Sequence, residues 1–318
     1  MRLLIVTQAV DRDDPVLGFF HRWIEEFAKK CEHVSVICLV EGAHSLPGNV
    51  RVYSLGKEKG ARSSFVYASR FLSLVWRLRR EYDAVFVHMN PEYVVIAGVL
   101  WRLMGKRIGL WYVHKQVNLK LRIATLLSHV VFTASRESFR LRSTKVHHTG
   151  HGIDTGFFTP DAATARGNHI LSVGRFSKSK RHDLVIRAAA LANRELRIAG
   201  EGEERGDLES LAHSLGAKVT FLGGLSQEQL RDEYRKAAYL VHTSETGSLD
   251  KVVLEALACD CPVITTSTAY EGLPVQCVVA TPEAIAKAAA PHEDANRVSA
   301  IREKHSLVAL IPRILQEL

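Results

Sequence analysis

Short apolar runs alternate with stretches of helical periodicity along the whole chain. In the first half, the runs that predict β-strands are Leu3–Val10, Val34–Val40, Val50–Ser54, Ala84–His88, Ile108–Val113 and Val130–Ala134. The stretches that predict helices between them are residues 16–31, 62–81, 91–105 and 118–128. Because apolar runs separated by helices are typical of strands buried on both faces, this half predicts a parallel sheet covered by helices.

The second half repeats this alternation. Its predicted strands are His169–Val173, Leu196–Ala199, Val219–Leu222, Leu240–Thr243 and Val263–Thr266. Eleven strands are too many for one short open sheet, so the chain predicts an α/β protein with two Rossmann-like domains that join near Phe158–Asp161. Such domains bind ligands beyond the carboxyl ends of their strands, and two of them are expected to face each other across a cleft.

The composition is typical of a globular protein. Of the 318 residues, 47% are hydrophobic and 24% are charged, and no apolar run approaches the roughly 18 residues of a membrane-spanning helix. The first apolar segment is too short for a signal peptide, so we expect a cytoplasmic protein. Its five cysteines lack metal-ligand spacing, and they are expected to be packing residues in a reducing compartment.

Positive charge is concentrated in the first half. Residues 1–160 contain 23 Lys and Arg against 13 Asp and Glu, whereas the rest of the chain contains 19 against 21. The first domain is therefore expected to meet an anionic partner, which is nucleic acid, an anionic membrane or a phosphorylated substrate.

The segment of residues 61–80 mixes aromatic side chains with cations, which suits an anionic bilayer surface. The residues concerned are Phe65, Phe71 and Trp76 with Arg62, Arg70, Arg77, Arg79 and Arg80. A core helix with a solvated basic flank explains the pattern equally well.

Two cations follow the predicted strand His169–Val173. Gly174 and Arg175 come directly after this strand, and Lys180 stands five residues later, just before a predicted helix. A forked guanidinium and a flexible ammonium together can neutralise a diphosphate. Solvated surface charge is the alternative, because further cations are neighbours in the sequence.

The stretch TGSLDKVVLEALAC, residues 246–259, predicts a turn followed by a helix. Ser248 is a suitable N-cap, Asp250 suits the first helical turn, and the amides of the turn would seat a phosphate. Glu255 stands in an otherwise apolar turn, where a carboxylate needs hydrogen bonds such as the vicinal hydroxyls of a ribose offer. A salt bridge with Lys251 on the same helix face is the alternative.

Polar residues also follow strands of the first domain. His88 and Asn90 end one predicted strand and His114 ends the next, so we expect them on the cleft side, near a sugar or an acceptor. A single strand-end histidine is more often structural or solvent-exposed, but two at equivalent positions favour a site. Gly18 follows the first strand, and its missing side chain would let a ligand phosphate approach the first helix.

Other nucleotide-binding and catalytic motifs do not occur in the sequence. Gly200-Glu-Gly202 begins like a dinucleotide fingerprint, but Arg205 replaces the third glycine. The chain has no Gly-Lys-Ser/Thr phosphate loop and no Gly-x-Ser-x-Gly nucleophile elbow. Three aspartates between residues 11 and 14 cluster without a recognisable metal-site spacing.

Together these segments resemble the GT-B-fold glycosyltransferases of family 4, which are retaining and metal-independent. SVGRFSKSK, at residues 172–180, resembles the family's Gly-Arg-x4-Lys element, and GHGIDTGFF, at 150–158, resembles its interdomain linker. FVHMN, at residues 86–90, is similar to a strand-end motif of the family. Residues 196–244 are similar to the middle of its second domain, and EKHSLVALI, at 303–311, resembles its closing helix.

The resemblance implies an acceptor-side domain over residues 1–158, a donor-binding domain over 159–304, and a C-terminal helix, about 305–318, that packs back onto the first. It implies transfer of a hexose, with retention, from a GDP- or UDP-sugar to an acceptor hydroxyl, without a metal or another cofactor. The acceptor would be a lipid-linked saccharide or another cell-surface glycan precursor, handled at the inner face of the membrane.

The resemblance also implies roles for individual residues. Arg175 and Lys180 would hold the donor diphosphate beside Gly174 and stabilise the leaving group in place of a metal. His114 would lie near the donor sugar, and Glu255 would bind the nucleotide ribose.

One position departs from the family pattern. Gly247 stands eight residues before the ribose-binding glutamate, where the family has a glutamate that contacts the donor sugar. Asp250 and Lys251 stand where the family has uncharged residues. We expect Asp250, Glu245 or the backbone amides at Gly247 and Ser248 to make the sugar contacts instead.

Two other functions are compatible with parts of the sequence. A nucleotide-sugar epimerase of the same fold would need acid and base groups at a sugar carbon, and none is identifiable. A basic nucleic-acid-binding protein would use the first half, but the sequence has no recognised reader motif, so we expect no nucleic-acid partner. Saturable binding of a nucleoside diphosphate, against salt-labile binding of DNA, separates these functions.

Overall fold

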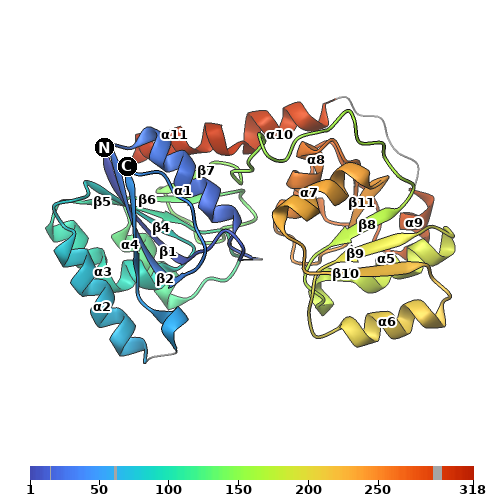
Figure 1. Ribbon diagram of the computed structural model, residues 1–318, viewed down its shortest axis with the longest axis horizontal. Coiled ribbons are helices and arrows are strands. Elements are labelled where there is room, and N and C mark those ends of the chain that lie inside the picture. The colour runs from blue at the N-terminus through green and yellow to red at the C-terminus, as the bar shows by residue number, and fades with distance from the viewer. Residues whose placement is uncertain (15, 61–62, 289–295) are drawn as a thin grey trace. The chain divides into compact units, whose positions relative to one another are not determined.

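The computed structural model describes residues 1–14, 16–60, 63–288 and 296–318, and it divides into two compact units (Figure 1). The first unit consists of Met1–Gly152 with Leu307–Leu318, and the second of Ile153–Ser306. Arg62, one cation of the basic segment, lies outside the described residues. Within the described ranges, none of the helices combines the length and the apolar character that crossing a bilayer requires.

The first unit is built on a parallel sheet of seven strands in the order β3-β2-β1-β4-β5-β6-β7. The strands are β1 (Arg2–Val10), β2 (His33–Glu41), β3 (Val50–Ser54), β4 (Ala84–His88), β5 (Arg107–Trp111), β6 (Val130–Thr133) and β7 (Val146–His148). The helices are α1 (Phe19–Lys30), α2 (Ser64–Arg77), α3 (Pro91–Leu103), α4 (Leu119–Leu127) and α11 (Leu307–Glu317), with the 3-10 turn η1 (Lys57–Lys59).

The second unit has a parallel sheet of six strands in the order β10-β9-β8-β11-β12-β13. The strands are β8 (Ile170–Val173), β9 (Leu196–Ala199), β10 (Val219–Gly223), β11 (Tyr239–His242), β12 (Val263–Thr265) and β13 (Gln276–Cys277). The helices are α5 (His182–Leu191), α6 (Arg205–Ser214), α7 (Gln227–Lys236), α8 (Lys251–Ala258), α9 (Pro282–Lys287) and α10 (Arg297–His305), with the 3-10 turns η2 (Lys178–Lys180) and η3 (Thr268–Tyr270).

Both faces of the first sheet are buried, which is why its strands appear as continuous apolar runs. Successive side chains of a strand point to opposite faces. Leu3 and Ile5 of β1 pack with α1 and α11, whereas Leu4 and Val6 pack with α2, α3 and α4. The second sheet is covered in the same way, by α7, α8 and α10 on one face and by α5, α6 and α9 on the other.

The structure confirms all eleven predicted strands, with ends that differ by at most two residues. The sequence analysis missed β7 and β13, which lie at the edges of the two sheets. They contain three and two residues, so they are too short to show a hydrophobic period.

The two units meet in the sequence at Gly152 and Ile153, six residues before the predicted junction. Ile153 is buried in the core of the second unit, and its N–H donates to the carbonyl oxygen of His305 at 2.6 Å. The closing helix α11 is part of the first unit, where it packs against α1. The guanidinium of Arg107 donates to the carbonyl oxygen of Glu317, 2.8 Å away, and so holds the C-terminal end of α11.

Two glycines bring the loops after β8 and β9 into backbone contact. Gly200 has a φ of +144°, and a Cβ there would lie far closer to the carbonyl oxygen of Gly174 than van der Waals contact allows. Gly202 has a φ of +156°, and a Cβ there would meet the carbonyl oxygen of Phe176 in the same way. The Gly-Glu-Gly motif therefore packs one loop on the other, because only glycine permits both the φ and the approach.

Gly200→Ala is therefore expected to destabilise the protein by about 2 kcal/mol or more, because the new Cβ strains the backbone and separates the two loops. Gly206→Ala is the matched control, since a Cβ at Gly206 has nothing within 4 Å. Urea unfolding measures both, and equal stabilities of the two variants would contradict this interpretation.

Buried histidines make the stability depend on pH in a defined window. Burial is the main cause that lowers the pKa of His182 and of His305 to about 4, and burial also lowers the pKa of His21, His129 and His169. The unfolded chain therefore binds these protons more readily than the folded one below pH 6.5.

The free energy of unfolding is expected to be fully present above pH 6.5 and to fall as the pH is lowered from 6.5 toward 4. His182 and His305 each contribute a slope of up to about 1.4 kcal/mol per pH unit. Urea unfolding between pH 7.5 and 4.5 measures this slope, and His305→Gln should reduce it. A stability that is constant over this range would contradict the prediction.

Candidate functional site

The predicted donor residues lie at the point where the second sheet changes winding direction. β8 and β11 are neighbours in the sheet, while the chain continues from β8 to β9 on one side and from β11 to β12 on the other. Loops that follow two such strands leave in opposite directions and open a ligand site between them. Gly174, Arg175 and Lys180 follow β8, and Gly247, with its flanking residues, follows β11.

Four hydrogen bonds join the two loops. The hydroxyl of Thr243 donates to the carbonyl oxygens of Lys180 and Arg181, at 2.8 and 2.9 Å. The N–H of Glu245 donates to the carbonyl oxygen of Ser179 at 2.9 Å, and the guanidinium of Arg181 donates to the Glu245 carboxylate at 2.5 Å. Both the backbone and a side chain of the loop after β8 therefore bind the loop after β11.

The two loops also share an ion pair between predicted site residues. Lys180 Nζ lies 2.5 Å from Oδ2 of Asp250 and 3.4 Å from Oγ of Ser244, and both charged side chains are half-buried. The sequence analysis placed both residues in the donor site but did not foresee that they pair. The ammonium is thus fixed above the N-terminus of α8.

Asp250 is surrounded by hydrogen-bond donors. His242 Nε2 lies 3.0 Å from its Oδ2, and the hydroxyl of Ser248 donates to its Oδ1 at 3.1 Å. Burial raises the pKa of this carboxyl, but the hydrogen bond from His242 and the charge of Lys180 outweigh burial, so the pKa is well below its ordinary value. Asp250 therefore stays ionised.

The N-cap prediction was wrong by two residues. α8 begins at Lys251, and its N-cap is Asp250 rather than Ser248. The Asp250 side chain caps no amide of the helix, because its oxygens bind Lys180, His242 and Ser248. The carboxylate of Asp250 therefore does not cap the positive end of α8, the end of a helix at which anions bind in proteins.

Gly174 and Arg175 form the other side of this site. Gly174 has a φ of +155°, and its N–H donates to the carbonyl oxygen of Ala199 at 3.0 Å. The carbonyl oxygen of Gly174 lies 3.3 Å from Nε2 of His182. The turn is thus fixed from β9 and from α5. The side chain of Arg175 projects from it and is exposed.

Glu255 is buried, with 8% of its surface exposed, and accepts a hydrogen bond from the hydroxyl of Tyr234 at 3.2 Å. Burial is the main cause that raises the pKa of Tyr234 well above its ordinary value, so this hydroxyl remains a donor. Burial lowers the pKa of Lys251, one turn earlier, and the charge of Glu255 partly offsets it. The carboxylate therefore has an internal partner, and its contact with a ribose stays a prediction.

The structure gives a second explanation for the glycine at position 18, which is the close approach of two backbone carbonyl groups. A Cβ at this position would lie 2.6 Å from the carbonyl oxygen of Asp14 and 2.7 Å from that of Arg12. The N–H of Gly18 donates to the same Asp14 oxygen at 2.9 Å. The space that a side chain would fill thus holds the chain's own carbonyl groups, which would repel a phosphate.

The strand-end residues of the first unit differ in exposure. His88 is 2% exposed, its ring stacks on Phe20 with centroids 3.9 Å apart, and its Nδ1 lies 3.3 Å from the hydroxyl of Thr7. The ring is therefore held within the first unit, and its contact with a sugar stays a prediction. Asn90 is half-buried, and its amide donates to the Gln8 side chain at 3.3 Å.

His114 lies in the loop after β5 and is exposed. The N–H of Gln116 donates to its Nδ1 at 3.1 Å, so Nδ1 carries no proton. The ring is therefore a donor through Nε2–H, which is the form that can bind a sugar hydroxyl.

The sequence analysis missed two histidines of the second unit. His242 is the last residue of β11 and contacts Asp250, and His182 opens α5 and contacts the turn at Gly174. His242 meets the strand-end criterion that singled out His88 and His114, so that signal could have found it. His182 lies beyond a 3-10 turn, where no such criterion applies.

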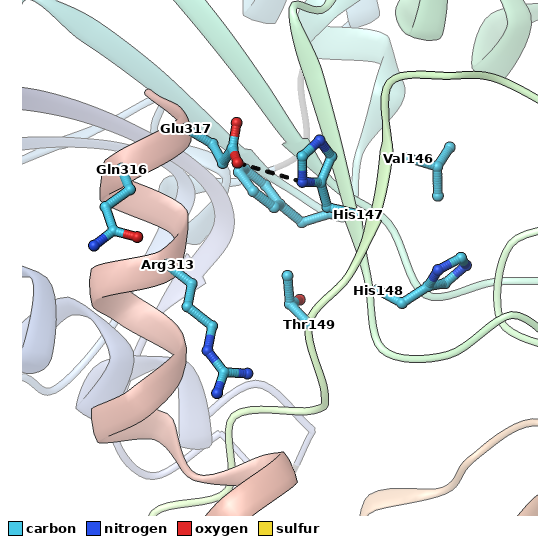
Figure 2. Close-up of a pocket in the computed structure, with 8 residues that line it drawn as sticks. Val146, His147, His148, Thr149, Arg313, Gln316 and Glu317 are labelled. Carbon is cyan, nitrogen blue, oxygen red and sulfur yellow. Dashed lines mark ion pairs between the residues drawn. The ribbon is translucent and has the colours of Figure 1, made fainter.

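A separate hollow lies within the first unit, and it contains none of the predicted site residues. It has a volume of about 290 Å³ between β7 and α11, and Figure 2 shows its lining residues. His147 Nδ1 lies 3.5 Å from the carboxylate of Glu317 across it. In the described part of the chain, no three His, Cys, Asp or Glu side chains are grouped as a metal site requires.

Part of the chain matches a known family. Residues 160–297 match the family described as Glycosyl transferases group 1. A segment of 141 residues is 38% identical to the D-inositol 3-phosphate glycosyltransferase of Mycolicibacterium smegmatis, and it covers 39% of this chain and 32% of that protein. The chain thus spans about a third of the length of the curated relatives it matches.

Solved structures resemble the whole chain at low sequence identity. HepE from Anabaena, determined in complex with UDP, has a TM-score of 0.77 and 16% identity, with 99% of both chains covered. Sucrose-phosphate synthase from Thermosynechococcus elongatus has a TM-score of 0.76 and 16% identity, with 99% of this chain and 98% of that one covered. The predicted fold class is confirmed: the chain has the GT-B fold of two Rossmann-like domains, and its residues 160–297 match the model of the group 1 glycosyl transferases.

Proposed function

We propose that the chain is a glycosyltransferase that moves a hexose from a nucleotide diphosphate sugar to an acceptor hydroxyl, with retention and without a metal. One observation carries the proposal: Lys180 and the N-terminus of α8, which the Asp250 side chain does not cap, meet at the switch point between β8 and β11. An ammonium and a set of helix amides converging on one point form an anion site. The family match over residues 160–297 contains this site, and HepE was determined with UDP.

In this proposal the donor diphosphate lies between the two loops. Lys180 and the amides of α8 neutralise the phosphate charge that grows as the glycosidic bond breaks, and Arg175 adds a forked donor from the turn after β8. Preorganised cations of this kind replace a metal ion. Glu255 binds the ribose, and the Nε2–H of His114 binds the donor sugar.

The acceptor oxygen attacks the sugar carbon from the face that the phosphate leaves, which retains the configuration. This route differs from glycoside hydrolysis, which needs two carboxylates across the bond. The carboxylates at the second unit's site all have cationic or hydroxyl partners: Asp250 pairs with Lys180, Glu245 with Arg181, and Glu255 with Tyr234.

Glu245 is the better of the two candidates for the sugar contact that Gly247 does not supply. Both oxygens of Asp250 already accept hydrogen bonds, from Lys180 and His242 on one and Ser248 on the other. Glu245 is more exposed, with 59% of its side chain accessible, and among the described residues its carboxylate is bonded by Arg181 at Oε1. We therefore assign the sugar contact to Glu245 and a different role to Asp250.

A panel of UDP-, GDP- and ADP-sugars tests the proposal by thermal shift and calorimetry. One nucleoside diphosphate should raise the apparent stability, by about 2.7 kcal/mol at a hundredfold excess over Kd. Lys180→Ala and Arg175→Ala should each weaken the binding of this nucleoside diphosphate by about tenfold or more, because a charge-assisted hydrogen bond to phosphate is lost.

Lys178→Ala is the matched control, because Lys178 is an exposed cation of the same loop. It should change the affinity by less than about threefold, as expected for a solvated surface charge. No binding of any nucleoside diphosphate, or equal losses at Lys178 and Lys180, would contradict the donor site.

We also propose that the acceptor is lipid-linked and that the first unit binds an anionic membrane peripherally, at its cytoplasmic face. In the described chain, fourteen large hydrophobic residues are exposed, and eight of them lie on α2, α3 and α4, which cover one face of the first sheet (Figure 1). These eight are Phe65, Trp76, Ile96, Val99, Leu103, Leu119, Ile123 and Leu126. A cluster of this kind marks an interaction surface.

Charge selects a bilayer as the partner of this face. The three helices contain five cations and one acid, Glu92, which is paired with Lys120 at 3.1 Å. The guanidinium of Arg79 lies 4.4 Å from the centre of the Trp76 ring, at the end of α2. Anionic lipid offers both an apolar layer and negative charge, whereas nucleic acid would leave the apolar side chains in water.

Leu103→Ser combined with Leu126→Ser should weaken binding to vesicles of phosphatidylcholine and phosphatidylglycerol by about tenfold, because these side chains are 81% and 72% exposed and would enter the lipid. Binding should fall with salt and with the removal of phosphatidylglycerol. Leu191→Ser, on α5 of the second unit, is the control, since Leu191 is 61% exposed. Equal losses in the control, or no sedimentation with anionic vesicles at low salt, would count against the membrane face.

A further inference from the structure

Asp250 carries a negative charge that is unfavourable for the binding of an anion beside it. It lies at the N-terminus of α8, in the site that the proposed function assigns to a diphosphate, and this inference rests on that function. A carboxylate beside an anion site repels the anion, and a half-buried location strengthens the repulsion. Its presence therefore needs a compensating role, which its contacts indicate.

The contacts of Asp250, besides Lys180, come from three different parts of the second unit. His242, at the end of β11, approaches Oδ2 to 3.0 Å, and Ser248 donates to Oδ1 at 3.1 Å. The N–H of Asp250 itself donates to the hydroxyl of Tyr270, on η3, at 2.7 Å. Backbone and carboxylate are thus both fixed, so the carboxylate is a rigid partner for the ammonium of Lys180.

His242 is the support for this arrangement. An ionised carboxylate can only accept, so Nε2 of His242 donates to Asp250, and the hydroxyl of Thr265 lies 3.2 Å from Nδ1 on the other side of the ring. His242 is buried among β11, β12 and η3 and therefore presents Nε2–H to Asp250. A chain of hydrogen bonds runs from Thr265 through His242 to Asp250.

We propose that Asp250, held by His242, is a positioning residue that fixes the ammonium of Lys180 for the donor diphosphate. A lysine side chain has four rotatable bonds and three N–H donors. One donor is directed at Asp250 and one at Ser244, 3.4 Å away, which leaves the third for a phosphate oxygen. Fixing the ammonium before the ligand arrives lowers the entropy that binding must remove.

Asp250→Asn tests the proposal through the sign of its effect. If Asp250 acts only as a charge, removing it should tighten the binding of UDP, GDP or ADP, whichever the unsubstituted chain binds best. If Asp250 positions Lys180, the same change should weaken the binding of the nucleoside diphosphate by about tenfold, although a negative charge has been removed. The matching nucleoside, which lacks phosphate, should bind equally to both proteins, and this also reports that the site is folded.

A double-mutant cycle identifies the route of the effect. In the background of Lys180→Met, the further change Asp250→Asn should no longer weaken the binding of the diphosphate, because the ammonium that Asp250 positions is absent. His242→Gln keeps an N–H near the Nε2 position and should retain most of the affinity, whereas His242→Leu should lose about as much as Asp250→Asn. Asp183→Asn, which removes another carboxylate from the same loop region, should leave the affinity unchanged.

Calorimetric titration of the full chain distinguishes the outcomes. Unchanged or tighter diphosphate binding by Asp250→Asn, or an undiminished effect in the Lys180→Met background, would overturn the positioning role while leaving the donor site intact. If the unsubstituted chain binds none of the three nucleoside diphosphates, the proposed function fails and this inference fails with it.

Discussion

The ion pair between Lys180 and Asp250 joins the two loops on which the candidate site depends. One loop follows β8 and the other follows β11, and the two strands are neighbours at the point where the second sheet changes direction. Hydrogen bonds from the hydroxyl of Thr243 to the backbone carbonyl oxygens of Lys180 and Arg181 hold the loops together, and the ion pair adds charge to that contact. Without it, the ammonium and the first amides of α8 would not be fixed at one point.

The second unit balances its buried charges locally. The half-buried Asp250 and the buried Glu255 each have a partner on a different element, which offsets the cost of removing these carboxylates from water. Glu255 of α8 is bonded by Tyr234 of α7, and Glu245 is bonded by Arg181. This internal pairing keeps the loops in one arrangement before any ligand is present, and such preorganisation is what stabilisation of a leaving diphosphate requires.

The sequence predicted the elements better than the contacts between them. Buried parallel strands are continuous apolar runs, so all strands of more than three residues were recognisable, and with them the loops that carry Lys180 and Asp250. Periodicity does not show which side chains meet across loops, so the pairing of Lys180 with Asp250 and the support by His242 appeared only in the structure. Gly18 shows a further limit of the sequence, because a glycine can make room for the chain's own carbonyl groups as well as for a ligand.

A crystal structure of the chain with a bound nucleoside diphosphate tests the central claim most directly. The claim predicts a phosphate oxygen within about 3 Å of Lys180 Nζ and of the first amides of α8, with Asp250 still bonded to His242. A diphosphate bound elsewhere on the second unit, with no phosphate oxygen near Lys180, would contradict it.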